Sequence, residues 1–385
     1  AVRKAIEISH EAGHRFYTYQ TTNPNIVMSD ITKLKCKLRG VVTEKFNSEI
    51  IWPSVASANE LQQKSAASFG AYTSGFWPSE LGPTLKIAEE FYTKNGLPIN
   101  EDLQWVNWVG DNFNQRYEHR QASTAAGSGI DGVSSLSEDH RYYIGSDQLT
   151  AKLNFYREPR FYAWLGFDRG IWEMNGQTDE SKSWVILARA GEAQGMMSGG
   201  RHNKSGYFSK KLVHMETIKN GANTGFTYES YTYPIIRLSD LYLLYAETLN
   251  ESKQSPDSEV YRWIDSVRLR AALEPVVQSY EKYAIPSQKN KPARKDGMRE
   301  IIKRERMIEL SFESQRFFDL LRWKDALQYF NEPVKGWSVH SANPDIYYTV
   351  TTYWDQREFN TRDYFWPLRL ETLQINSNLK QNPGW

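Results

Sequence analysis

The sequence predicts a mainly α-helical fold in which helical hairpins support an irregular, partly β region. From residue 233 on, apolar residues recur every three or four positions, as on one face of a helix. Residues 20–232 show no such periodicity over long segments and are rich in aromatic residues. In the whole chain, Trp, Tyr and Phe together make up 14% of the residues. We therefore expect a single domain over residues 1–385, with an irregular region at 20–232 and a helical scaffold at 233–385.

A few elements of the first half can be placed from local patterns. Residues 1–19 are periodic and predict a helix and its exit. Pro83 and Gly96 predict a helix over 83–95, because Pro fits the first helical turn and Gly the position after the last one. The runs "PRFYAWLGF" and "SKSWVILARA" indicate strands through aromatic alternation and a short apolar stretch.

The second half predicts three longer helices. The first begins at a cap formed by Ser239 or Asp240, and the second has Ser255 as cap and Pro256 at its first position. Together they make a hairpin of tetratricopeptide-like length. The third helix, over 296–329, is the longest, and its acidic and basic residues recur at three and four spacings, which on a helix makes them neighbouring ion pairs.

Charge and cysteine content exclude several classes of protein. Lys plus Arg is 47 and Asp plus Glu is 46, so the net charge is +1 and the strong basic bias of a nucleic-acid binder is absent. Cys36 is the only cysteine, so no disulfide can form within the chain. The sequence contains no run of about 18 uncharged apolar residues, which is the length that a membrane-spanning helix needs.

The opening helix carries a motif of metal chemistry, His10-Glu11-Ala12-Gly13-His14, which matches the zinc-peptidase pattern H-E-x-x-H. Two histidines four apart on a helix can share a zinc ion while the Glu activates its water. Here they fall on the polar face of the predicted helix, and Gly13 predicts that the helix ends before His14. No third ligand is indicated, so we interpret the motif as a solvated helix end and expect no metal and no cofactor.

A second motif, "GSGIDG" at 127–132, matches the dinucleotide pattern G-x-G-x-x-G. That fingerprint needs a strand before it and a helix after it, and neither "QASTAA" nor "VSSLSED" fits. We expect a flexible polar loop over 121–138. The chain also has no G-x-S-x-G nucleophile elbow and no P-loop lysine, so we do not expect an enzyme.

Several segments carry more specific patterns. They are "PTLKIAEEFYTKNGLPI", "EPRFYAWLGFDRG", "YPIIRLSDLYLLYAETLNE", "WIDSVRLRAAL", "IIKRERMIELSFESQRFFDLLRW" and the ending "YFWPLRLETLQINSNLKQNPGW". In this order they resemble the SusD/RagB family of nutrient-binding lipoproteins of the Bacteroidetes outer membrane. The resemblance covers most of residues 83–385. It departs from the family at Ser314-Gln315, where Gly and a basic residue or His are usual, and at Glu158, where Asp is usual.

The resemblance implies a SusD-like fold, with tetratricopeptide-like hairpins whose arginines and glutamates tie helices together. It implies non-catalytic capture of a glycan, or of another nutrient, at the cell surface. It also implies a partner, a SusC-like TonB-dependent outer-membrane transporter. Members of the family carry a signal peptide, a lipidated cysteine and an N-terminal helical segment. We find none of these here, so we expect that the chain lacks its N-terminal part and that a lipid anchor outside it holds the protein to the outer membrane.

In this family the ligand surface lies in the variable, aromatic part, which here is the region 20–232. An exposed Trp can stack on the apolar face of a pyranose ring while neighbouring polar groups bind the hydroxyls. The candidate glycan-binding residues are Trp77, Trp105, Trp108 and Trp172, with Trp337 as a further candidate. The alternative for each is a place in the core, because Trp buries well.

Two other functions remain open alternatives. One is a helical-repeat scaffold that binds only protein within an outer-membrane complex, although the irregular aromatic region differs from such a uniformly helical array. The other is a zinc metallopeptidase acting through His10, Glu11 and His14, against which the polar placement of the motif argues.

Overall fold

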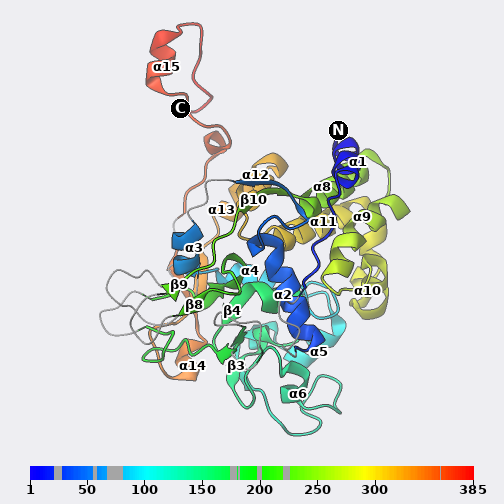
Figure 1. Cartoon of the computed structure of the whole chain (residues 1–385), viewed down its shortest axis with the longest axis vertical. Helices are drawn as coiled ribbons and strands as arrows, with labels where there is room; N and C mark the ends of the chain where they lie inside the picture. Colours follow the sequence, from blue (N-terminus) through cyan, green and yellow to red (C-terminus); the bar gives the residue numbers. More distant parts are fainter. Residues whose placement is uncertain are drawn as a thin grey trace.

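The N-terminal helix packs with helices from the second half of the sequence. A computed structural model describes residues 1–20, 28–54, 59–66, 81–173, 180, 183–196, 202–219, 226–355 and 357–385. The helices α8 (Leu238–Ser252) and α9 (Ser258–Arg270) form the predicted hairpin. The helices α1 (Val2–Glu11) and α11 (Lys295–Glu309) pack on α8, and α10 (Val276–Tyr283) packs on α9 (Figure 1). Their apolar stripes meet in a buried cluster that includes Ile6, Leu243 and Ile264.

A second, larger buried cluster lies among short strand pairs and two helices. The helix α2 (Asp30–Thr43) packs against α7 (Pro159–Trp164). In the described parts of the chain the strands form six antiparallel pairs: β1 (Ile50–Ser54) with β10 (Tyr233–Arg237), β2 (His119–Gln121) with β3 (Leu149–Ala151), β4 (Leu165–Phe167) with β7 (Tyr207–Ser209), β5 (Ile171–Trp172) with β6 (Trp184–Val185), β8 (Ile218–Lys219) with β9 (Phe226–Thr227), and β11 (Val334–Trp337) with β12 (Val350–Trp354). The predicted mainly helical fold with a partly β region is therefore confirmed.

The remaining helices are short and lie mostly around this second cluster. They are α3 (Asn59–Ala66), α4 (Leu85–Glu90), α5 (Leu103–Val109), α6 (Leu136–His140), α12 (Gln315–Trp323), α13 (Ala326–Phe330), α14 (Pro344–Tyr347) and α15 (Leu370–Ile375). The C-terminal segment carries α15 away from the body of the molecule (Figure 1). None of the helices in the described ranges is long and apolar enough to cross a membrane.

Several predicted elements differ from the structure. The run "PRFYAW" is the helix α7 and not a strand, with Pro159 in its first turn, and only Leu165–Phe167 continues as a strand. The helix predicted over 83–95 ends at Glu90. The region predicted to be irregular contains α2, which is fourteen residues long and largely buried.

The cap residues of the α8–α9 hairpin also differ from the prediction. The helix α8 begins at Leu238, after Arg237, rather than at a Ser239 or Asp240 cap. The cap of α9 is Asp257 and not Ser255, because the Asp257 carboxylate accepts hydrogen bonds from the backbone N–H groups of Glu259 and Val260.

The long helix predicted over 296–329 is three helices, α11, α12 and α13. The chain leaves α11 after Glu309, and Phe312 and Ser314 take φ angles of 65° and 64°. These left-handed conformations cannot continue an α-helix. The break turns α12 away from the axis of α11 and places its residues beside α4, where the candidate site lies.

Buried ion pairs join the segments that carry the family resemblance. Arg237, at the junction of β10 and α8, donates hydrogen bonds to Glu309 at 2.7 Å, to Glu313 at 2.6 Å and to Glu49 at 2.8 Å. Arg160 of α7 contacts Glu309 at 3.0 Å. All five side chains are almost completely buried. The expectation that these arginines and glutamates tie the elements together is confirmed by these contacts.

Candidate functional site

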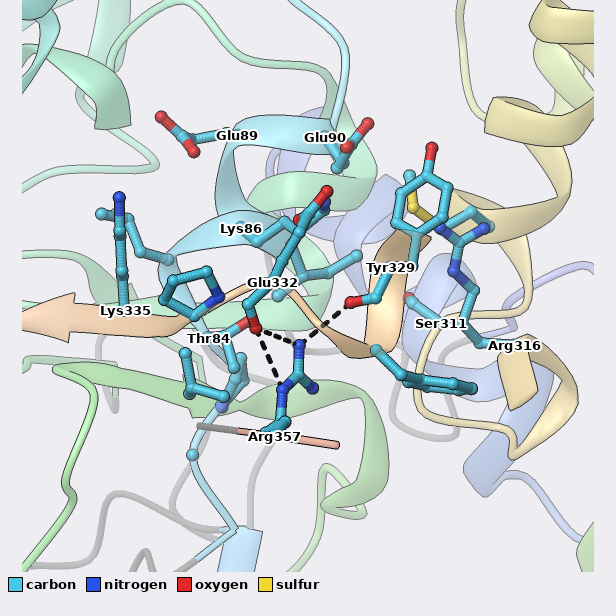
Figure 2. A pocket seen from close by; sticks show the side chains of 18 of the residues that line it. Thr84, Lys86, Glu89, Glu90, Ser311, Arg316, Tyr329, Glu332, Lys335 and Arg357 are labelled. Carbon is cyan, nitrogen blue, oxygen red and sulfur yellow. Dashed lines mark hydrogen bonds and ion pairs between the residues drawn. The ribbon is translucent and has the colours of Figure 1, made fainter. Parts of the chain in front are cut away.

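A pocket of about 720 Å³ opens between α4 and the segment that runs from α12 to β11 (Figure 2). Its walls come from α4, the 3-10 turn at Phe113–Tyr117, the break after α11, the helices α12 and α13, the first residues of β11, and Arg357. This volume lies within the range of pockets that enclose small ligands, roughly 300–1,000 Å³. These parts of the chain are far apart in the sequence.

The pattern of α4 decides which of its side chains reach the pocket. Leu85 and Ala88 are three residues apart, lie on one side of the helix and are buried in the core. Lys86, Glu89 and Glu90 carry the charges of this helix, and all three line the pocket together with the apolar Leu85 and Ile87 (Figure 2). A single short helix thus presents one cation and two anions to the cavity.

An aromatic residue of α13, Tyr329, lies in the pocket wall next to two cations. The Nζ atom of Lys86 is 4.3 Å from the centre of the Tyr329 ring, and the Cζ atom of Arg316 is 4.6 Å from it. Lys86 also forms an ion pair with Glu332. Burial, and secondarily the charge of Glu90, raise the pKa of Tyr329, so its phenol stays neutral and able to donate a hydrogen bond.

A second tyrosine and an arginine hold the carboxylate of Glu89. The Nε atom of Arg116 donates to Glu89 at 2.9 Å, and the Tyr117 hydroxyl donates to the same oxygen at 2.6 Å. Burial and the hydrogen bond to Glu89 raise the pKa of Tyr117 well above its usual range. The Arg116 guanidinium lies 4.0 Å from the centre of the Tyr117 ring. The aromatic and charged groups on this wall are therefore fixed in place.

Arg357 holds the chain that closes the other side of the pocket. Its Nη2 atom donates to the backbone oxygen of Glu332 at 2.6 Å and to that of Tyr329 at 3.0 Å, and its Nε atom donates to Glu332 at 3.1 Å (Figure 2). These bonds satisfy carbonyl groups at the end of α13 that have no helical partner. They set the position of Tyr329 and of the turn into β11.

The structure places Trp105, Trp172 and Trp337 in the core and not in this pocket. Trp105 and Trp172 are each only 1% exposed, and so is Trp337. The Trp105 Nε1 atom donates to the Phe155 backbone oxygen at 3.2 Å, and Trp172 stacks on Trp184 with ring centres 5.8 Å apart. In this structure these rings have no free face for a sugar, so their predicted role as sugar-stacking residues conflicts with their burial.

The other two predicted tryptophans have different outcomes. Trp108 shares one helix with Trp105, as the spacing predicted, but it is half-buried and packs on Phe155 and Tyr156, with ring centres 5.8 and 5.1 Å away. Trp77 lies outside the described residues. Trp108 is not among the described residues that line the pocket at α4.

Replacing Trp105 by Ala is expected to lower the free energy of unfolding by about 3–5 kcal/mol, because a large buried ring leaves a cavity. Urea unfolding followed by circular dichroism measures this loss. The matched control is Trp354→Ala, since Trp354 is 61% exposed, and its effect should stay within about 0.5 kcal/mol. A Trp105→Ala protein of unchanged stability that no longer binds a glycan would restore Trp105 as a ligand contact.

The sequence reasoning missed the pocket residues for a clear reason. Arg316 and Tyr329 stand in the charged segment that was interpreted as one scaffold helix, and Lys86 stands in another family-like segment. Only the departure from the family pattern at Ser314-Gln315 signalled that this stretch is unusual. That position is the left-handed turn which aims α12 at the pocket.

The two histidines of the H-E-x-x-H motif contact different groups. Gly13 has a φ angle of 90°, and α1 ends at Glu11, so His14 lies outside the helix as predicted. The His10 Nε2 atom is 2.6 Å from the Tyr242 hydroxyl, whereas the His14 Nδ1 atom is 3.2 Å from the Ser48 backbone oxygen. Within the described ranges no three His, Cys, Asp or Glu side chains come together as a metal site.

The "GSGIDG" motif lies in the loop between β2 and α6. Its backbone closes on itself, with the Gly129 N–H donating to Ser134 at 2.9 Å and the Gly127 N–H donating to Val133 at 3.0 Å. The Asp131 carboxylate accepts the N–H groups of Val133 and Ser134. The motif adjoins neither β2, which ends at Gln121, nor α6, which begins at Leu136, whereas a dinucleotide fingerprint directly follows its strand and opens its helix.

Comparison with known proteins identifies the family. The model of the SusD family matches residues 48–385, and the chain belongs to that family. A solved structure named BT4246 superposes with a TM-score of 0.73 at 22% identity, over 100% of this chain and 61% of that one. A SusD-like protein, BF3747 from Bacteroides fragilis NCTC 9343, superposes with a TM-score of 0.65 at 20% identity, over 100% and 62%. No curated protein matches.

These comparisons confirm the resemblance and the fold that the sequence predicted. At these identities the solved structures show the fold alone. The chain spans about three fifths of the length of the two solved structures it matches.

Proposed function

We propose that this protein captures a glycan at the bacterial cell surface and delivers it, chemically unchanged, to a SusC-like TonB-dependent outer-membrane transporter. Membership of the SusD family supports the class of function. The sugar site that we propose is the pocket between α4 and β11. The observation that carries this assignment is its lining, in which Tyr117 and Tyr329 stand among fixed charged side chains. A lipid anchor would hold the protein at the surface.

The chemistry of the pocket suits a sugar. A pyranose ring has an apolar face, which packs on aromatic side chains, and hydroxyl groups, which need hydrogen-bond partners. The tyrosines with Phe312 and Phe330 supply apolar surface, and Lys86 and Arg316 supply donors. Because ion pairs and backbone contacts already hold these side chains in place, they lose little conformational entropy when a ligand binds.

The same contacts favour binding over catalysis. A glycosidase needs a carboxylic acid and a carboxylate that face the scissile bond and can exchange protons. Here Glu89 is held by Arg116 and Tyr117, Glu332 by Lys86, and Glu90 by Arg304 at 2.7 Å. Each of these three carboxylates thus has a cationic partner within the protein, which suits a structural role.

Replacing Tyr329 by Ala is expected to weaken glycan binding about tenfold or more, which corresponds to ~1.4 kcal/mol, because the variant loses ring surface and a donor. Affinity gel electrophoresis of the full chain through starch, xylan, mannan, levan, pectins and mucin glycans identifies the ligand, and calorimetry then measures Kd. The matched control is Tyr142→Ala, which changes a half-buried tyrosine outside the pocket. It should bind as the unchanged protein does.

Two results would contradict the proposal in different ways. If Tyr329→Ala binds as well as the unchanged protein, the site lies elsewhere, and Trp77 or Trp108 would be examined next. If the unchanged protein is not retarded by any polysaccharide, glycan capture itself is wrong and the protein-binding scaffold becomes the better explanation. Co-purification of a TonB-dependent transporter from solubilised outer membranes tests the proposed partner separately.

A further inference from the structure

The charges that line the pocket do not balance. Among the described residues that line it, five are cations, namely Lys86, Arg116, Arg316, Lys335 and Arg357, and three are carboxylates, Glu89, Glu90 and Glu332. Each carboxylate already has a partner: Arg116 for Glu89, Lys86 for Glu332 and Arg304 for Glu90. Within the described parts of the chain, Arg316, Lys335 and Arg357 have no carboxylate at ion-pair distance.

These three cations come from separate elements and surround the cavity. Arg316 belongs to α12, Lys335 to β11, and Arg357 to the segment after β12. In Figure 2, Lys335 and Arg316 lie on opposite sides of the pocket and Arg357 lies below them. Arg316 is half-buried and its guanidinium contacts the Tyr329 ring, whereas the Arg357 bonds all go to uncharged backbone oxygens. None of these contacts neutralises a charge.

A partly enclosed cavity with surplus positive charge favours an anionic ligand. Charges of one sign in a cleft with low-dielectric walls raise the local concentration of the opposite ion. Hydrogen bonds between a guanidinium and a carboxylate or sulfate are also stronger than those to a neutral hydroxyl. A neutral glycan would leave the three cations without a counter-charge, whereas an acidic one would supply it.

We propose that the ligand of this pocket is an acidic glycan, whose carboxylate or sulfate groups are bound by Arg316, Lys335 and Arg357. This inference rests on the proposed capture of a glycan in the same pocket. The tyrosines would contact the sugar ring, and the three cations would select the charged substituent. The specificity for an acidic sugar therefore comes from α12, β11 and the chain after β12.

Matched pairs of polymers test the charge preference in the full chain. Polygalacturonate is compared with fully methyl-esterified pectin for the carboxylate, and dextran sulfate with dextran for the sulfate. We expect one acidic polymer to bind at least about tenfold more tightly than its neutral counterpart, the pair identifying which group is recognised. The variant Arg316→Gln/Lys335→Gln should lose this preference and keep the thermal midpoint of the unchanged protein.

The control separates recognition from general charge attraction. Lys289→Gln/Lys380→Gln removes two exposed cations outside the pocket and should keep the preference. If this control weakens acidic binding as much as the pocket variant does, the attraction is not specific and the inference is wrong.

The failure of this inference differs from the failure of the proposed function. If a neutral polymer binds as tightly as its acidic counterpart and Tyr329→Ala weakens that binding, the proposed glycan capture is supported and the proposed specificity for acidic glycans is wrong. If no polymer of either kind binds the unchanged protein, both fall together.

Discussion

Replacing Glu309 by Gln is expected to lower the free energy of unfolding by about 3–5 kcal/mol, the usual effect of removing one member of a buried ion pair. Glu309 is completely buried at the end of α11. It contacts Arg237 at 2.7 Å and Arg160 at 3.0 Å, and it also pairs with Arg270. Gln preserves the shape of the side chain but leaves three guanidinium groups with less negative charge around them, so the loss reflects charge and not packing.

The pH dependence of this effect has a definite sign. Burial alone would raise the pKa of Glu309, but the guanidinium groups of Arg270, Arg237 and Arg160 hold it well below the usual range of a glutamate. A carboxylate whose pKa is lowered on folding contributes stability above the pKa of the unfolded state, and this contribution is lost as the pH falls below that value. The unchanged protein should therefore lose more stability than Glu309→Gln between pH 5 and pH 2.

Urea unfolding at pH 7 and at acidic pH measures both effects. The matched control is Glu251→Gln, because Glu251 pairs with Arg299 at the surface and both side chains are about 40% exposed. An exposed pair contributes about 0–1 kcal/mol. If Glu309→Gln falls within about 1 kcal/mol of the unchanged protein at pH 7, the buried network does not stabilise the fold as we argue.

Local signals in the sequence explain which elements could be predicted. The α8–α9 hairpin is recognisable because each helix has its own apolar period. Gly13 ends α1 because its φ angle of 90° suits a residue without a side chain. Each of these signals lies within a few residues of the feature that it predicts.

The helix α2 was missed because charged residues interrupt its apolar period. Lys35 and Arg39 face the core and are 2% and 1% exposed. They are stable there because Glu173, more than 130 residues further along the chain, accepts hydrogen bonds from the Lys35 Nζ atom and, through its backbone oxygen, from Arg39. A partner so distant in the sequence produces no local pattern. From the sequence alone, a buried helix face that carries charged residues therefore cannot be told from a face exposed to solvent.

The pocket could not be predicted for a related reason. Its charged and aromatic groups come from α4, the turn before β2, α12 to β11, and Arg357. The sequence shows tryptophans as conspicuous candidates but does not show which rings the fold covers. Trp172 lies in the aromatic region where the sequence predicts a sugar site, yet its ring is covered. Trp184 stacks on it, and the cations of Arg39 and Lys210 lie 5.6 and 5.8 Å from its centre.

Replacing Glu173 by Gln is expected to lower the free energy of unfolding at pH 7 by about 3–5 kcal/mol, as much as replacing Glu309 by Gln. Glu173 is 2% exposed, and it is the carboxylate that Lys35 contacts at 2.6 Å, Lys210 at 2.7 Å and Arg39 at 3.5 Å. Burial alone would raise its pKa, but Lys210, Lys35 and Arg39 lower it to about 2. The variant would therefore enclose three cations around a neutral amide.

The difference in unfolding free energy between the unchanged protein and Glu173→Gln should become smaller as the pH rises from 7 to 10. Lys210 decides the sign of this change, because burial lowers its pKa to about 7 against the attraction of Glu173, and without that carboxylate the folded protein holds the proton less strongly still. Near pH 7 the excess of protons bound by the unfolded chain is therefore larger for the variant, so its stability rises with pH more steeply than that of the unchanged protein. Urea unfolding at several pH values measures the difference, with the exposed Glu138→Gln as control.

Glu173→Gln also distinguishes the two locations considered for the sugar site. Trp172 is the neighbour of Glu173 in the chain and lies over the same cations, whereas Tyr329 and Arg316 belong to the pocket at α4. If the glycan binds in that pocket, folded Glu173→Gln protein at pH 9 should bind with unchanged affinity while its tryptophan fluorescence shifts. If the variant keeps its stability at pH 7 and loses glycan binding, the ligand contacts the Trp172 region, as the sequence first indicated, and the pocket at α4 has another role.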